Sequence, residues 1–203
     1  MRIRIGNLTI RITFLFAVFL AVAANIAGGR NVLLSFLFSF LHEAVHLIFL
    51  YLSGIKKAEL VFLPGGIKII CNGLSGLSYK KTALCALAAP VFNVFAGASF
   101  YVLYIFLKDE ILFFCCVINF VSGLINLMPM RFLDGGRAAE AFLLRRLDEE
   151  NAVKIMVRLS VLSVIALFSM FFVGCIMGKI QIFLLIFSIY CFIGVFSDKE
   201  YKK

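Results

Sequence analysis

Polar and apolar positions alternate along this chain in long blocks rather than residue by residue. Six apolar runs approach the roughly 20 residues that a helix needs to cross about 30 Å of hydrocarbon. They cover residues 8–27, 32–52, 82–107, 111–128, 152–177 and 180–196. The pattern predicts an all-α polytopic membrane protein with six transmembrane helices. Its hydrophobic content of 63% exceeds what a soluble domain carries.

A different pattern lies between the second and third runs. Residues 58–71 contain two β-rich stretches separated by Pro64, Gly65 and Gly66. We expect a small β-hairpin here. It either rests on the membrane as a cytoplasmic loop or offers an edge strand to an extended peptide, with Gly65 and Gly66 beside the substrate. The sequence leaves both interpretations open.

The remaining segments add no soluble domain. Residues 136–150 predict a short amphipathic helix at the membrane interface. There is no internal repeat and no low-complexity tract. We therefore expect residues 1–203 to form one integral-membrane domain, without an appended soluble domain.

The positions of the charges predict the orientation in the membrane. The net charge is +9, but the cations flank apolar runs, which argues against a nucleic-acid partner. Seventeen of the 20 lysines and arginines fall on the side that holds both termini, leaving Arg30, Lys108 and Lys179 on the other side. This bias predicts a multi-pass membrane protein with cytoplasmic termini. The six cysteines mostly lie in apolar runs without C-x-x-C spacing, so we interpret them as small apolar residues.

The chain has two histidines, and both lie in the second apolar run. His42 and His46 are four residues apart, so on a helix both imidazoles lie on one face. This spacing suits two ligands of one zinc ion, and Glu43 between them is placed to act as general base on the water that the metal activates. Such polar residues in a membrane helix are costly, and the usual explanation is function.

A catalytic zinc usually has three protein ligands, so one more is needed. Asp134 is the candidate, because Pro129 should break the helix before it and Gly135 and Gly136 allow the backbone to turn and approach closely. The alternative is that Asp134 caps the next helix. Asn93 and Asn126 are either polar contacts between helices or donors to a substrate carbonyl or oxyanion.

These residues resemble the site-2 protease family of intramembrane zinc metalloproteases. The resemblance rests on H-E-x-x-H at residues 42–46, P-x-x-N at 90–93, N-x-x-P followed by L-D-G-G at 126–136, and the Pro-Gly-Gly hairpin. It covers nearly the whole chain. Six spans with cytoplasmic termini are similar to the sporulation branch, typified by stage IV sporulation protein FB. The family often has glycine where Ala89 stands, and the nucleotide-sensing or PDZ domains of other members are not expected here.

The resemblance implies an intramembrane zinc endopeptidase that performs regulated proteolysis. Its substrate would be a membrane-associated protein, a pro-sigma factor in the sporulation branch and an anti-sigma factor or remnant signal peptide in others. A membrane-protein regulator and a homo-oligomer are left open. The first rival is a divalent-metal transporter, which should carry a polar path through several spans, whereas the fifth and sixth runs hold no histidine, and no acidic residue in their apolar parts. The second rival is a non-catalytic scaffold, which would not need Glu43.

Overall fold

The chain begins with a β-hairpin that the apolar runs did not predict. In the computed structural model, which describes residues 1–27, 29–64, 66–178 and 181–197, β1 (Arg2–Ile5) pairs antiparallel with β2 (Leu8–Ile12). The helix expected over 8–27 is therefore wrong at its start, and α1 covers Phe14–Ala27. Residues 2–12 alternate between polar and apolar side chains, and this period of two is that of a strand.

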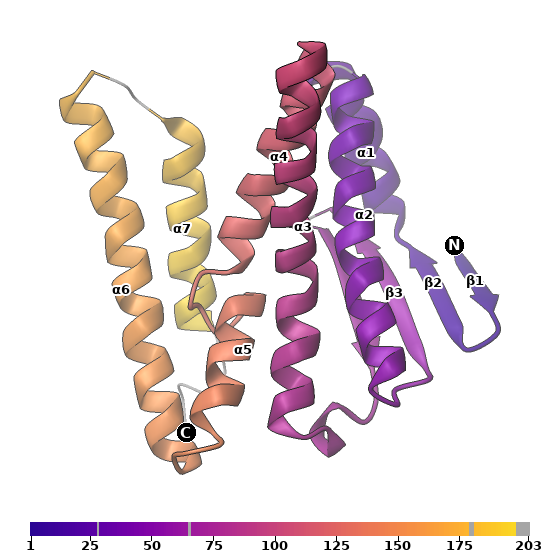
Figure 1. Cartoon of the computed structure of the whole chain (residues 1–203), viewed down its shortest axis with the longest axis vertical. Helices are drawn as coiled ribbons and strands as arrows, with labels where there is room; N and C mark the ends of the chain where they lie inside the picture. The colour runs from indigo at the N-terminus through magenta and orange to yellow at the C-terminus, as the bar shows by residue number, and fades with distance from the viewer. Residues whose placement is uncertain (28, 65, 179–180, 198–203) are drawn as a thin grey trace. The chain divides into compact units, whose positions relative to one another are not determined.

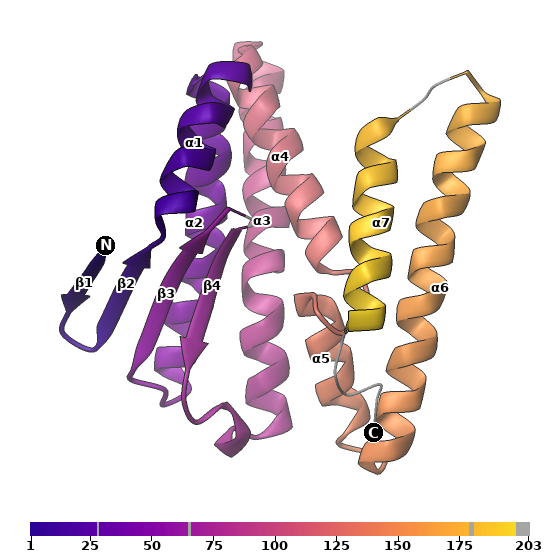
Figure 2. The same ribbon diagram turned by 180° about the vertical axis from the view of Figure 1, so that it is seen from behind.

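This hairpin forms one side of a four-stranded sheet, whose strand order is β1-β2-β3-β4 (Figures 1 and 2). β3 (Ala58–Leu63) runs parallel to β2, and β4 (Gly66–Cys71) runs antiparallel to β3. The hairpin expected over residues 58–71 is confirmed. The expected mostly helical class is confirmed, and the small sheet has four strands, two more than the expected hairpin.

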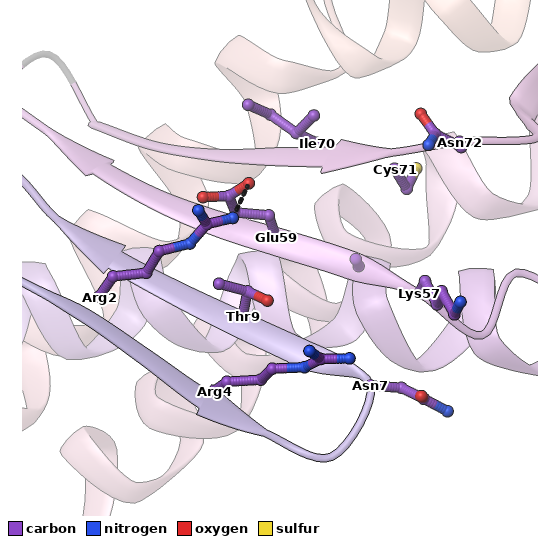
Figure 3. Close-up of a pocket in the computed structure, with 10 residues that line it drawn as sticks. Arg2, Arg4, Asn7, Thr9, Lys57, Glu59, Ile70, Cys71 and Asn72 are labelled. Carbon is purple, nitrogen blue, oxygen red and sulfur yellow. Dashed lines mark ion pairs between the residues drawn. The ribbon is translucent and has the colours of Figure 1, made fainter.

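The two faces of the sheet differ in polarity. The apolar face packs against α1 and α2 (Gly29–Leu52), and Figure 2 shows the sheet in front of α2. Phe16 of α1, Phe36 of α2 and Phe62 of β3 meet there, with ring centroids 5.4 to 5.9 Å apart. Arg2, Arg4, Thr9 and Glu59 lie on the other face (Figure 3).

Two further helices complete the first compact unit, residues 1–125. They are α3 (Tyr79–Leu107) and α4 (Glu110–Asn126), whose last residue opens the second unit. Glycines let these helices approach closely. A Cβ on Gly123 would lie 2.9 Å from Val94 and 3.1 Å from the Pro90 carbonyl oxygen, and one on Gly97 would lie 3.0 Å from the Phe120 ring.

The second compact unit, residues 126–203, contains α5 (Asp134–Leu143), α6 (Glu149–Ile176) and α7 (Ile182–Ser197). Its core consists of buried apolar side chains from the turn before α5 and from the two long helices: Met130, Val164, Leu167, Cys191 and Val195. The amphipathic helix expected over 136–150 is present as α5. It starts two residues earlier than expected and ends at Leu143. The last residues of the expected range belong to α6, whose start is capped by Asp148 through a hydrogen bond from the Asn151 N–H.

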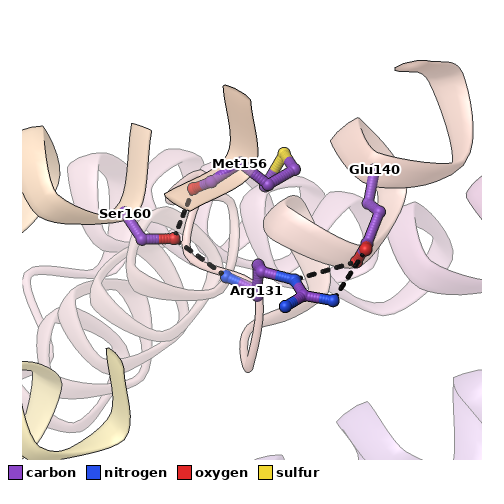
Figure 4. Close-up of polar contacts among 4 residues, drawn as sticks. All are labelled: Arg131, Glu140, Met156 and Ser160. Atoms are coloured by element: carbon purple, nitrogen blue, oxygen red, sulfur yellow. Dashed lines mark hydrogen bonds and ion pairs between the residues drawn. The ribbon is translucent and has the colours of Figure 1, made fainter. Parts of the chain in front are cut away.

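An ion pair fixes the turn before α5. The Arg131 guanidinium donates to Glu140 of α5, with 2.9 Å between Nη2 and Oε1 (Figure 4). The Arg131 backbone N–H donates to Ser160 Oγ of α6 at 3.4 Å, and that hydroxyl donates to the Met156 carbonyl. The side chain of Arg131 is 7% exposed, so this pair is shielded from solvent.

Three helices among the described residues are long and apolar enough to cross a membrane: α2, α3 and α6. The other three apolar helices are shorter, so six full spans are not confirmed. α1 has 14 residues and would extend about 21 Å at 1.5 Å per residue. α4 and α7, with 17 and 16 residues, would extend about 25 Å.

We predict that Gly123→Ala destabilises the protein by about 1–3 kcal/mol, because the new methyl group would press against Val94 and the rigid backbone at Pro90. Unfolding of the purified chain in detergent, followed by circular dichroism, measures the effect. Gly29→Ala is the matched control, since nothing lies within 4 Å of its added Cβ. Equal stability of the two variants would contradict the close approach of α3 and α4.

Candidate metal centre

Helix α2 brings the two histidines together as the spacing predicts. The imidazole rings of His42 and His46 lie with centroids 4.9 Å apart at an interplanar angle of 85°. Both residues are buried, with 5% and 9% exposure. Buried imidazoles need hydrogen-bond partners or a metal ion, because an unsatisfied polar group away from water is costly.

The partner of His46 determines its tautomer. Its Nδ1 lies 2.8 Å from the backbone carbonyl oxygen of Cys85 on α3. A carbonyl oxygen only accepts hydrogen bonds, so Nδ1 carries the proton and donates it. The neutral ring then has its lone pair on Nε2. This arrangement, an imidazole oriented by a bond from its other nitrogen, is typical of histidines that bind metals.

His42 is oriented in the same way by a side chain. Its Nδ1 lies 3.2 Å from Oδ1 of Asn93, which is fully buried on α3. With the amide oxygen facing the ring, Nδ1 donates and Nε2 again holds the lone pair. Asn93 was expected at the substrate or between helices, and the structure places it against His42. Its Nδ2 is buried without a hydrogen-bond partner.

A proline lies in α3 close to the carbonyl that serves His46. Pro90 has no N–H, so the Ala86 carbonyl, next to that of Cys85, loses its usual helical donor. Close approach of Gly123 from α4 packs the opposite side of this segment at the Pro90 carbonyl.

Glu43 follows His42 on α2 and is half-buried. Successive residues on a helix are rotated by about 100°, so its carboxylate leaves the helix beside the histidine face rather than on it. The donor chemistry of this segment fits a divalent transition metal. Each imidazole offers one nitrogen as a ligand atom, and a carboxylate lies next to the first histidine in sequence.

Asp134 is the first residue of α5 in the second unit and is 9% exposed. Leu133 occupies the N-cap position and makes no side-chain capping bond, and Asp134 is the acidic residue of the first turn. The glycines after it are required by close packing. A Cβ on Gly135 would overlap the Leu127 carbonyl, and one on Gly136 would overlap the Met130 carbonyl.

The other candidates are placed as follows. Asn126 ends α4 and is half-buried. Gly66 begins β4 with a positive φ of 132°, and Gly65 lies outside the described residues. The contact that sequence analysis missed is the Cys85 carbonyl, because a backbone group has no residue signature.

Two comparisons with known proteins agree with a peptidase fold. Residues 108–167 match the sequence model of Peptidase family M50. That segment contains α4, the turn before α5, Asp134 and most of α6. The solved structure "Site-2 Protease from Methanocaldococcus jannaschii" is similar over 98% of this chain and 94% of that chain, with a TM-score of 0.65 and 20% sequence identity.

The chain has the fold of a site-2 protease. A search of curated proteins found no significant sequence match to this chain. The family match and the H-E-x-x-H helix cover different parts of the chain, since the match begins after α3. The two observations are therefore independent, one in each half of the chain.

We predict that Asn93→Ala weakens binding of Zn²⁺ by about 10- to 100-fold, because the His42 ring loses the bond that orients it. Competition with a chelator on the purified protein measures this affinity. Asn119→Ala is the control. It removes another fully buried asparagine, whose Nδ2 donates within its own helix to Cys115. A similar affinity in both variants would remove Asn93 from the support of the metal centre.

Proposed function

We propose that the protein is an intramembrane zinc metalloendopeptidase. The observation that carries this proposal is the pair of buried imidazoles on one helix, each oriented through its Nδ1 atom by a partner on α3 and each able to offer one nitrogen to a metal. The match to Peptidase family M50 and the site-2 protease fold support a peptidase rather than a structural metal protein.

His42, His46 and Asp134 would hold the metal. Each offers one ligand atom, an imidazole nitrogen from the histidines and a carboxylate oxygen from the aspartate. Such a set leaves one tetrahedral position open, as catalytic zinc sites do. When bound, zinc would polarise the scissile carbonyl and lower the pKa of water to about 7.

The chain's own residues would then do the proton transfers. Glu43 takes a proton from the attacking water and passes it to the leaving amine, as a general base and then a general acid. Asn93 holds His42 in its ligating orientation, and its Nδ2 is a buried donor available to a substrate carbonyl. Asn126 is proposed to orient the substrate as well.

The proposed substrate is a membrane-associated protein that binds in an extended conformation. β4 is a terminal strand of the sheet, and such a strand can pair with an added peptide through backbone groups. Gly65 and Gly66 at the start of β4 would keep the approach to that edge open. Resemblance to the sporulation branch favours a membrane-tethered pro-sigma factor. The charge bias favours cytoplasmic termini and access from the cytoplasm.

We predict that Glu43→Gln lowers the rate of proteolysis by about 10²- to 10⁴-fold, because the general base is lost while the imidazoles remain. The rate is measured with purified enzyme and a panel of membrane-tethered pro-sigma and anti-sigma proteins, and bound zinc by mass spectrometry. Glu110→Gln, on an exposed residue of α4, is the matched control. Turnover by Glu43→Gln at the rate of the control would refute the assignment.

A second prediction concerns the third ligand. Asp134→Ala should lose most of its bound zinc, because a two-histidine site lacks the carboxylate that completes it. Zinc content and chelator competition provide the readout.

Asp148→Ala is the control for Asp134→Ala, since Asp148 is an aspartate that does cap a helix. The hydrogen bonds from Asn151 hold the pKa of the Asp148 carboxyl below its usual range. The carboxylate is therefore charged and the cap is formed at neutral pH, and the cap is lost only when the pH falls below that lowered pKa. At neutral pH this control tests a helix cap alone. Full zinc content in Asp134→Ala would exclude Asp134 as a ligand.

The third prediction concerns the edge of β4. Leu63 and Gly66 pair across a two-residue loop, which normally closes on a hydrogen-bonded pair, so we expect Ile67 and Ile69 to direct their N–H groups outward. Proline at either position should impair cleavage and leave zinc bound, because it removes an edge donor. Ile69→Ala removes the side chain but keeps the N–H, and should cleave normally. Normal cleavage by both proline variants would contradict strand addition.

A further inference from the structure

The outer face of the sheet is basic. Strand register places Arg2 opposite Arg11, and Val61, the neighbour of Arg11 on β3, opposite Lys68. Arg4, Thr9 and Glu59 form the next row, on the same face because side chains two residues apart share a face. This face therefore carries four cations, Arg2, Arg4, Arg11 and Lys68, and one carboxylate.

Repulsion among these cations is unfavourable unless an anion lies between them. Arg2 and Arg11 lie directly opposite each other, and like charges in this relation destabilise a sheet. Arg2 is partly balanced by Glu59, with 3.5 Å between Nη2 and Oε2. The Arg4 side chain donates from Nε to the Gly6 carbonyl at 3.4 Å, so that contact leaves its charge without compensation.

The same face is hollowed at one end of the strands. An open concavity of about 620 Å³ is lined by Arg2, Arg4 and Lys57 and by the polar side chains Asn7, Thr9 and Asn72 (Figure 3). Of the described residues that line it, Glu59 is the one carboxylate. Its size and charge suit a phosphate-bearing group, because arginine forks bind phosphate oxygens with two parallel hydrogen bonds.

An exposed apolar surface follows directly after the basic strands. Helix α1 begins two residues after β2 ends, and Figure 2 shows it rising from the end of that strand. Phe14 and Leu15 at its start are 81% and 66% exposed, and Phe19 one turn later is 51% exposed. A basic surface followed by an apolar one matches a molecule with an anionic head and hydrocarbon chains. An acidic peptide would not need the apolar part.

We propose that this face binds the headgroup of an anionic phospholipid, with the acyl chains along the exposed side of α1. Arg2, Arg4 and Lys57 line the concavity and contact the phosphate region, and Arg11 adds its charge from the position opposite Arg2. The opposite, apolar face of the sheet stays packed on α1 and α2. Binding would anchor the sheet, and with it the edge strand β4, at the level of the lipid headgroups. The site does not involve the histidines or Asp134.

The test compares the binding of fluorescently labelled phosphatidylglycerol and phosphatidylcholine to the purified full chain in detergent. In Arg4→Gln/Arg11→Gln, affinity for phosphatidylglycerol should fall by roughly 30-fold, at about fivefold per arginine near an anionic surface. Affinity for phosphatidylcholine should not change. The control is Arg30→Gln/Lys108→Gln, which removes two exposed cations elsewhere and should bind phosphatidylglycerol as the parent chain does. Circular dichroism and zinc content confirm that both variants are folded.

Two results would overturn the proposal. One is equal phosphatidylglycerol affinity in the two double variants, which would mean that the affinity depends only on the net charge of the protein and not on this face. The other is an arginine-dependent affinity for hexaglutamate that displaces the labelled lipid and exceeds the lipid's own affinity. That result would assign the face to an acidic polypeptide.

Discussion

The candidate centre depends on two hydrogen bonds that join the imidazoles of α2 to α3. Without the Cys85 carbonyl and Asn93, both histidines could rotate and could carry their protons on either nitrogen. With them, both rings have a fixed orientation and a fixed tautomer, which preorganises two ligands before a metal arrives. The cost of burying two imidazoles in an apolar helix is offset by these bonds. Gly123 of α4 lets that helix approach α3 closely at Val94 and the Pro90 carbonyl.

The second unit is organised to present an aspartate at the start of a helix. Pro129 ends the preceding helical segment, and Gly135 and Gly136 lie against the Leu127 and Met130 carbonyls, where no larger residue fits. Arg131 then ties the same turn to α5 and α6 through Glu140 and Ser160. Close backbone packing of the two glycines that follow it thus fixes the position of Asp134 at the start of α5.

The H-E-x-x-H helix and the hairpin at residues 58–71 were predictable because their patterns are local. The N-terminal hairpin was equally local, and it was missed because a hydropathy window averages the alternation of Ile3, Ile5, Leu8, Ile10 and Ile12 into an apolar run. Six full spans are not confirmed, because three of the apolar helices are shorter than 18 residues; the first of them is shortened by strand β2, which takes the start of its apolar run. The partner of His46 could not be predicted, because it is a backbone carbonyl brought near by tertiary packing.

X-ray absorption at the zinc edge of the purified, zinc-loaded chain tests the central claim most directly, since it reports the atoms that contact the metal. Two imidazole nitrogens and oxygen ligands should appear at about 2.0–2.1 Å, without a sulfur shell near 2.3 Å. The imidazole signal should vanish in a His42→Ala/His46→Ala variant. A sulfur shell, or imidazole scattering that persists in that variant, would contradict a centre built on α2.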